Sequence, residues 1–369
     1  MTADGLGGVW TYAIELVREF GRRGIEVAMA TMGSPLQLDQ ARQASRINNL
    51  EVFESDLKLE WMPDPWQEVD DAGDWLLYLE QLVEPDIVHL NGYVHGVLPW
   101  NSPTVMVAHS CVSSWWQAVK DESVPPQWNT YVERVTRGLA SADHVVAPTF
   151  SMLRSVEENY GRLSSTSVIH NGRAAEGFRS GPKDDLVFSA GRLWDEAKNI
   201  AALDRIAAGL PWPVFIAGDR SADAVDDRSS LALNNSRLLG RLSLKELSDW
   251  YSRASVYVLP AKYEPFGLTA LEAGISGCAL VLGDIPSLRE VWDDAALFVS
   301  PHDDDELRDT IVQLIENAGL RQEMADRART RASRFTPQKM SDAYIELYAG
   351  LLQYRSAEIT QVQENIACV

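Results

Sequence analysis

The sequence predicts an α/β protein whose chain forms two doubly wound domains facing a cleft. Length is the first observation, because 369 residues correspond to two or three domains of roughly 150 residues each. The second is that short β-rich runs alternate with longer amphipathic stretches along almost the whole chain, which is typical of parallel βαβ units. The third is a polar turn segment that divides this alternation into two series.

The first series occupies residues 1–172. Apolar residues at helical spacing predict a helix from Val9 to Phe20, and Ile25–Thr31 is predicted as the strand that follows it. The further predicted strands are Asp86–Leu90, Thr104–Ala108, His144–Ala147 and Ser167–His170, and the further predicted helices are Asp71–Val83, Tyr131–Ala142 and Ser151–Tyr160. Together these elements predict a Rossmann-like N-terminal domain.

The start of the chain departs from this plan. A glycine-rich loop begins at Gly5, four residues after Met1, whereas doubly wound folds place a strand before such a loop. Either the first strand is very short or the reading frame extends upstream. We expect an upstream extension of about five to eight residues that forms this strand.

The second series begins after the turn dipeptide Asn171-Gly172 and covers residues 173–336. Its predicted strands are Leu186–Ala190, Val214–Ala217, Arg237–Gly240, Val256–Leu259, Ala279–Leu282 and Leu297–Val299, and its predicted helices are Asn199–Ala208, Leu244–Arg253 and Leu268–Ile275. A last helix, Pro337–Leu352, should return to the first domain within residues 337–355 and bury Tyr344, Leu347 and Tyr348 there. Residues 356–369 are expected to be a frayed tail.

Composition excludes several classes of protein. The net charge of −20, without any block of five Lys or Arg residues, disfavours nucleic acid and anionic membrane surfaces as partners. The apolar runs are far shorter than the roughly 20 residues that span a bilayer, so we expect no integral membrane segment. Three widely separated cysteines support neither a disulfide framework nor a CxxC metal site. With no signal peptide in the sequence, we expect a cytoplasmic protein.

The strongest local motif is Glu264-Pro265-Phe266-Gly267-Leu268 followed by Glu272. It joins a buried strand to a helix, whose N-terminal N–H groups favour a diphosphate above the carboxyl end of the strand. Glu264 and Glu272 would then bracket a polyol, each accepting hydrogen bonds from hydroxyl groups. The alternative is a helix-capping glutamate and a solvated one.

Two further segments suggest contact with an anionic ligand. Arg192 and Lys198 follow a predicted strand and would supply two cations for a diphosphate, unless they only pair with Asp195 and Glu196. Gly7 and Gly8, with Gly5, would let the backbone approach a phosphate or sugar at a helix N-terminus. An ordinary strand-to-helix turn is equally consistent with these glycines.

Taken together, these segments resemble the retaining GT-B glycosyltransferases of family 4, over nearly the whole chain and in the family's order. The E-x7-E segment is the most specific part of the resemblance. The others are Gly7-Gly8-Val9, His109, the run Ser141 to Ala147 followed by Thr149 and Ser151, Asn171-Gly172, Gly191-Arg192 with Lys198-Asn199, and Ala217-Gly218-Asp219.

The resemblance implies a role for each matching residue. Arg192 and Lys198 correspond to the pair that holds the donor diphosphate, although the gap between them is one residue longer than in the commonest family pattern. Glu264 corresponds to the carboxylate beside the donor sugar and Glu272 to the carboxylate on the nucleotide ribose. The remaining correspondences are Phe266, Gly267 and Leu268 with the backbone that meets sugar hydroxyls and phosphate, His109 with a histidine near the reacting sugar, and Gly240-Arg241-Leu242 with main chain near the base.

The implied activity is transfer of a sugar from a nucleotide diphosphate sugar to a sugar or small-molecule acceptor, with retention and without a metal or another cofactor. No Asp-x-Asp stands in the E-x7-E or Gly-Arg segments. A non-catalytic nucleotide-sugar sensor or scaffold and a nucleotide-sugar epimerase remain as alternatives. Six tryptophans are candidates for stacking on an acceptor, of which we expect one or two to do so: Trp61, Trp66, Trp75, Trp115, Trp116 and Trp194.

Overall fold

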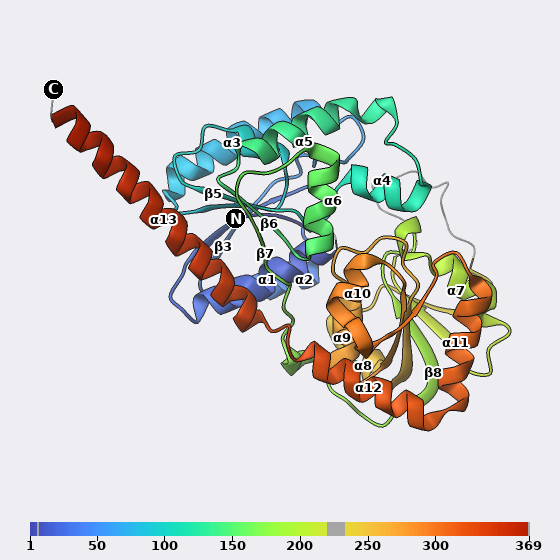
Figure 1. Ribbon diagram of the computed structural model, residues 1–369. Helices are drawn as coiled ribbons and strands as arrows, with labels where there is room; N and C mark the ends of the chain where they lie inside the picture. The colour runs from blue at the N-terminus through green and yellow to red at the C-terminus, as the bar shows by residue number, and fades with distance from the viewer. Residues whose placement is uncertain (6, 220–232, 368–369) are drawn as a thin grey trace.

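The computed structural model describes residues 1–5, 7–219 and 233–367, with side chains up to residue 355. Figure 1 shows two domains side by side, each an α/β unit, and a long C-terminal helix that runs from the second domain along the first. The α/β class and the two doubly wound domains predicted from the sequence are therefore confirmed.

The first domain contains two parallel sheets in the described residues. One has the strand order β1-β2-β3 and the other the order β4-β5-β6-β7. Their bounds are β1 Thr2–Asp4, β2 Val27–Met32, β3 Leu50–Glu54, β4 Val88–Leu90, β5 Thr104–Val107, β6 His144–Ala147 and β7 Thr166–Val168. The helices are α1 Gly8–Gly21, α2 Leu38–Ala44, α3 Trp66–Val83, α4 Val112–Lys120, α5 Asn129–Ser141 and α6 Phe150–Tyr160.

The second domain has one parallel sheet with the order β10-β9-β8-β11-β12-β13. Its strands are β8 Asp184–Ala190, β9 Val214–Ala217, β10 Arg237–Gly240, β11 Ala254–Leu259, β12 Ala279–Gly283 and β13 Leu297–Val299. The helices are α7 Ile200–Ala207, α8 Leu244–Arg253, α9 Leu268–Ile275, α10 Pro286–Trp292, α11 Asp304–Glu316 and α12 Ala318–Ala332. Every residue of β11 is buried, as expected for a parallel strand covered by helices on both faces.

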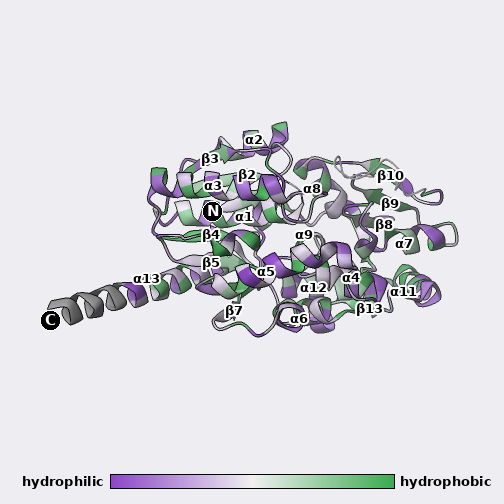
Figure 2. Ribbon diagram, turned by 90° about the horizontal axis from the view of Figure 1, so that it is seen from above, coloured by the Kyte–Doolittle hydropathy of each residue, from purple (hydrophilic) through white to green (hydrophobic). Residues whose placement is uncertain are grey.

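Hydropathy follows this layering. Figure 2 shows hydrophobic colours at strands such as β4 and β8 and mixed colours on helices such as α11. The largest fully buried side chains include Trp292, Tyr251 and Tyr257 in the second domain. Within the described residues, no helix combines the length and the apolar character needed to cross a membrane.

The structure shows a strand before the glycine loop and a last helix longer than predicted. A three-residue strand, β1, precedes the glycine loop and pairs in parallel with β2, while the expected upstream extension stays a prediction. Helix α13 spans Pro337–Ala367, so the expectation of a frayed tail after Arg355 is wrong up to Ala367. Residues 368 and 369 lie outside the described part of the chain.

Two segments of the chain pass between the domains next to each other. The backbone N–H of Arg173, on the outward crossing, donates to the carbonyl oxygen of Phe335, on the return crossing, at 3.1 Å. Gly172 packs so tightly there that a Cβ atom would lie 2.3 Å from the carbonyl oxygen of Thr336. The two crossings therefore form one narrow hinge.

After the hinge, α13 packs on α1 of the first domain, as predicted. Tyr344 is fully buried there, and Leu347 and Tyr348 pack partly buried against the same core. The Tyr348 hydroxyl also hydrogen-bonds with Nδ1 of His89 at 2.5 Å. The first domain is thus completed by residues from the far end of the chain.

Deleting α13 from Pro337 onward is expected to leave insoluble protein, because the truncation uncovers the apolar face of α1. A truncation after Arg355 is the matched control and should stay soluble, since it keeps all the core contacts described for α13, which run from Met340 to Leu351. Solubility and thermal melting of the two truncated proteins test this. A soluble, active protein ending before Pro337 would contradict the expectation.

Candidate functional site

The candidate site lies where the two central strands of the second domain end. β8 and β11 pair in parallel, with Phe188 opposite Tyr257, so the loops that follow them meet at one edge of the sheet. The first loop carries Arg192 and Lys198, and the second carries Glu264. Lys198 Nζ donates to Glu264 Oε2 at 2.8 Å, and both side chains are largely buried. Two motifs that the sequence identified separately therefore form one cluster.

Glu264 also binds the first turn of α9. Its Oε1 accepts hydrogen bonds from the backbone N–H groups of Gly267 at 3.0 Å and Phe266 at 3.4 Å. Gly267 has φ 90°, a left-handed conformation that favours glycine. The capping role weighed for Glu264 is thus present, together with the ion pair to Lys198. A carboxylate held by three donors is fixed in orientation above the strand end.

Arg192 is the more accessible cation of the cluster, with 43% of its side chain exposed. Its Nη2 donates to Asp195 Oδ2 at 2.9 Å, and its guanidinium lies 5.3 Å from the ring centroid of Trp194. The alternative that both cations pair with Asp195 and Glu196 is thus observed for Arg192 alone, which pairs with Asp195. Lys198 pairs with Glu264 instead, and Glu196 pairs with Lys120.

Asp195 links this loop to the first domain. It accepts a hydrogen bond from Trp115 Nε1 of α4 at 3.0 Å as well as the bond from Arg192. Burial raises the pKa of Asp195, but the charges of Lys198 and Arg192 and the bond from Trp115 outweigh it, so the net shift of the pKa is downward. Trp115 thus forms a hydrogen bond between the two domains, and the acceptor stacking considered for it stays a prediction.

The glycine loop of the first domain lies close to the same cluster. A Cβ atom at Gly7 would lie 3.3 Å from Nη1 of Arg192, and one at Gly8 would lie 3.5 Å from Cδ1 of Leu268. Gly7 also has φ 75°. The loop therefore brings bare backbone close to Arg192 and to the start of α9, where side chains would narrow the space for a ligand.

His109 follows β5 in the first domain. The amide nitrogen of Asn91 donates to the carbonyl oxygen of Thr2 at 2.7 Å, so the Asn91 oxygen faces His109 and accepts from its Nε2 at 2.8 Å. Burial lowers the pKa of His109 to about 3. The imidazole is therefore neutral near pH 7, with its proton on Nε2 and its Nδ1 free of a proton.

Glu272 lies in a buried ion cluster instead of in the open cleft. Nε of Arg173 donates to Glu272 Oε1 at 2.8 Å, and Nη1 of Arg173 pairs with Glu15 of α1. At most 6% of each of these three side chains is exposed. Burial raises the pKa of Glu272, and the charge of Arg173 opposes that rise. The alternative of a solvated Glu272 is therefore wrong.

The remaining predicted residues occupy different environments. Arg241 is half exposed, with Nη2 3.7 Å from Asp39 of α2, and Leu242 packs partly buried on the core of the second domain. Of the other tryptophans, Trp66 lies under the guanidinium of Arg134, and the apolar clusters of the first domain include Trp61, Trp66 and Trp75. Among the described residues, no group of three or more His, Cys, Asp or Glu side chains could hold a metal ion.

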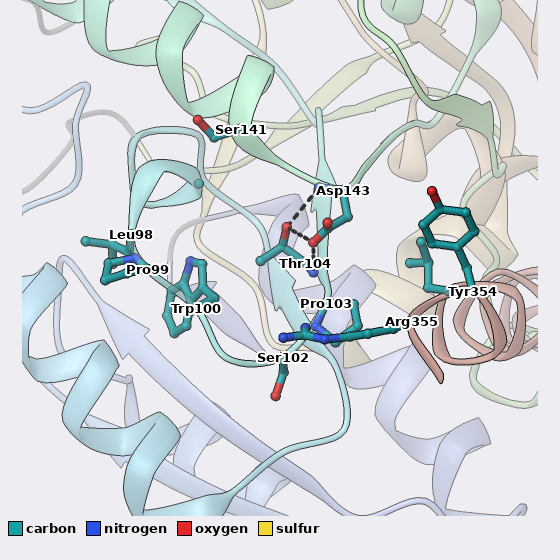
Figure 3. Close-up of a pocket in the computed structure, with 12 residues that line it drawn as sticks. Leu98, Pro99, Trp100, Ser102, Pro103, Thr104, Ser141, Asp143, Tyr354 and Arg355 are labelled. Carbon is teal, nitrogen blue, oxygen red and sulfur yellow. Dashed lines mark hydrogen bonds between the residues drawn. The ribbon is translucent and has the colours of Figure 1, made fainter. Parts of the chain in front are cut away.

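A hollow with a volume of about 370 Å³ lies at the other end of the first domain's strands, away from the glycine loop and His109. Figure 3 shows it between the start of β5 at Thr104, Asp143 before β6, and Arg355 of α13. Asp143 accepts hydrogen bonds from the backbone and hydroxyl of Thr104 at 2.7 and 2.9 Å. Since His109 follows the other end of β5, this hollow is separate from the site between the domains.

Sequence reasoning missed Arg173, Glu15 and Asn91. Glu15 carried a usable signal, because it lies among the apolar residues of an amphipathic helix, where a buried acid requires a partner. Arg173 stood in a polar linker, where an arginine is ordinary. Only the fold brings α1, the hinge and α9 together around it.

Two family descriptions match consecutive parts of the chain. Residues 6–176 match "Glycosyltransferase Family 4" and residues 174–331 match "Glycosyl transferases group 1". The glycogen synthase of Mycobacterium tuberculosis is 32% identical over 225 residues, which cover 56% of this chain and 54% of that protein's length. The D-inositol 3-phosphate glycosyltransferase of Xylanimonas cellulosilytica is 25% identical, with 95% of this chain and 93% of that protein covered.

Solved structures show the same fold at low identity. Sucrose-phosphate synthase from Thermosynechococcus elongatus superposes with a TM-score of 0.79 at 18% identity, covering 96% of each chain. Anabaena Alr3699/HepE superposes with a TM-score of 0.72 at 17% identity, covering 95% of this chain and all of that one. Since both halves match in order and the two-domain fold is shared, the chain belongs to the group 1 glycosyltransferases of the GT-B fold.

Proposed function

We propose that this protein transfers a sugar from a nucleoside diphosphate sugar to an acceptor hydroxyl group, with retention of configuration at the anomeric carbon. The observation that carries the proposal is the cluster of Arg192, Lys198 and Glu264 at the carboxyl ends of β8 and β11, with Gly7 of the first domain close to Arg192. This edge of a parallel sheet is where doubly wound folds bind nucleotides.

Arg192 and Lys198 hold the donor diphosphate. Both cations lie in the loop after β8, and although Arg192 pairs with Asp195 and Lys198 with Glu264, each has further N–H donors that an anionic ligand could accept. Negative charge grows on the leaving phosphate as the glycosidic bond breaks, and two fixed cations together with the first turn of α9 stabilise it. The backbone of Phe266, Gly267 and Leu268 meets the sugar hydroxyls and the phosphate.

The other site residues bind the two ends of the donor. Glu264, fixed by Lys198 and the first turn of α9, lies beside the sugar and favours the positive charge that develops on its ring. Glu272 accepts hydrogen bonds from the ribose, and main chain at Arg241 and Leu242 lies near the base. Neutral His109 offers Nδ1 as an acceptor near the reacting sugar.

The reaction needs no protein base in this proposal. The bond between the anomeric carbon and the leaving phosphate oxygen breaks, and the acceptor oxygen forms its bond on the same face of the ring. The acceptor proton passes to the leaving phosphate oxygen, which gains the electron pair of the broken bond. Arg192 and Lys198 supply the positive charge, so we propose that transfer is independent of metal and of any other cofactor.

Slow hydrolysis of donors in the absence of an acceptor tests the proposal. UDP-glucose is the first donor to try, because HepE, which shares the fold, was solved with UDP-glucose, and a panel of UDP, ADP and GDP sugars follows. We expect release of one nucleoside diphosphate, unchanged by EDTA. The proposal is wrong if no donor is hydrolysed or bound, and its metal-free part is wrong if EDTA abolishes release and magnesium or manganese restores it.

Glu264→Gln is expected to depress turnover of the donor by about 10²–10³-fold, because the amide cannot stabilise positive charge on the reacting ring. The donor KM should change less, since the amide oxygen still caps the first turn of α9. Glu246→Gln is a suitable control, because Glu246 caps α8 in the same domain from an exposed position. Equal loss of turnover in both variants would contradict a catalytic role for Glu264.

A further inference from the structure

The hinge carries a charged cluster that the proposed reaction does not explain. Arg173 lies where the chain passes from the first domain to the second, next to the return crossing at Phe335. Its side chain lies between Glu15 of α1 and Glu272 of α9, with the guanidinium 4.9 Å from the ring centroid of Phe178. One buried side chain thus contacts the hinge and an element of each domain.

The charges of this cluster do not balance. The guanidinium of Arg173 faces the carboxylates of Glu15 and Glu272, and all three side chains are nearly inaccessible to water. A buried carboxylate without a partner strongly destabilises the folded state. The bond from Arg173 Nε to Glu272 Oε1 is therefore strongly favoured and fixes the plane and direction of the Glu272 carboxylate. A rigid guanidinium with two separate donors suits this double contact better than a flexible ammonium group.

We propose that Arg173 is a positioning residue that orients Glu272 toward the ribose hydroxyls of the donor and couples this carboxylate to α1 of the first domain. The inference rests on the proposed function, since it assumes that Glu272 binds the ribose. It also connects two walls of the donor site, because α1 begins at the glycine loop that lies against Arg192 and Leu268.

A comparison of nucleotides with and without the ribose hydroxyls tests the coupling. Calorimetric titrations use UDP against 2′,3′-dideoxy-UDP, or the ADP or GDP pair if the donor panel selects another base. We expect the wild-type protein to bind the complete nucleotide about tenfold or more tightly, the scale of a hydrogen bond to a charged group. In Glu272→Gln and in Arg173→Met this ratio should fall to about twofold or less, and in Arg173→Lys to an intermediate value.

Glu19→Gln is the matched control. Glu19 is a buried carboxylate one turn after Glu15 on α1, and it pairs with Arg22 and Gln338 rather than with Arg173. Its replacement should leave the wild-type ratio intact. A merely structural role for Arg173 would weaken the binding of both nucleotides equally, so the ratio separates positioning from general loss of stability.

The possible outcomes separate this inference from the proposed function. An unchanged ratio in Arg173→Met overturns the inference while the donor site stands. If that variant does not fold, an unchanged ratio in Arg173→Lys overturns it instead. If the wild-type protein binds both nucleotides equally tightly, Glu272 does not bind the ribose hydroxyls and Arg173 does not position it for that contact. A wild-type protein that binds none of UDP, ADP and GDP overturns the proposed function as well.

Discussion

Arg192→Ala is expected to cost about 2–4 kcal/mol of transition-state stabilisation, or roughly 30- to 1,000-fold in kcat/KM for the donor. The guanidinium lies at the carboxyl end of β8, and in the proposed reaction it faces charge that grows on the leaving phosphate. Since 43% of the side chain is exposed, its removal should change the melting temperature by only a few degrees. Donor kinetics and thermal melting of the purified variant measure the two effects.

A matched control for Arg192→Ala is Arg205→Ala. Arg205 is also an exposed arginine paired with an aspartate, Asp304, but it lies on α7 at the side of the second domain. Its loss should leave donor kinetics unchanged. If Arg192→Ala instead unfolds the protein while the folded fraction keeps full activity, then Arg192 serves the ion pair with Asp195, and the assignment to the diphosphate fails.

Most of the fold could be predicted because its strands are buried on both faces. Runs such as His144–Ala147 and Val214–Ala217 are short, mostly apolar and mostly buried, and the structure gives them the same bounds. The predicted elements did not include the strand β3 or the helices α2, α4, α10, α11 and α12. Of these, β3 and α2 are short and only partly buried, so their apolar periodicity is weak. The helix α13 was predicted too short, although no glycine or proline follows Gly350 to end it.

The candidate site could be predicted as a neighbourhood but not as a set of contacts. Parallel strands end at one edge, so Arg192, Lys198 and Glu264 had to lie near one another. Asp195 and Glu196 are the carboxylates nearest to Lys198 in the sequence, but Lys198 pairs with Glu264, which only the sheet brings close. Glu272 was expected in the open cleft, because nothing in the sequence indicates that the hinge supplies a buried arginine.

The second large effect expected is on stability. Arg173→Met should lower the free energy of unfolding by about 3–5 kcal/mol, because it leaves Glu15 and Glu272 buried without their cation. Equilibrium unfolding in urea measures this loss. Arg253→Met is the control for an exposed pair: Arg253 is 53% exposed and bonds to Asp184, which is 48% exposed, so its loss should cost less than about 1 kcal/mol.

The mechanism of that loss makes two further outcomes testable in the same experiment. The triple variant Glu15→Gln, Arg173→Met, Glu272→Gln should recover much of the stability, since the cost comes from unpaired buried charge and not from the missing arginine itself.

The loss of stability in Arg173→Met should also be smaller near pH 5 than near pH 8. Burial already raises the pKa of Glu272, and without Arg173 the main charge that opposes this rise is lost. A carboxyl group with a raised pKa in the folded state binds more protons there than in the unfolded chain, so stability falls as the pH rises from about 4.5 through the folded-state pKa. A loss independent of pH, which the triple variant does not relieve, would show that Arg173 stabilises the hinge by packing on Phe178 rather than by its charge.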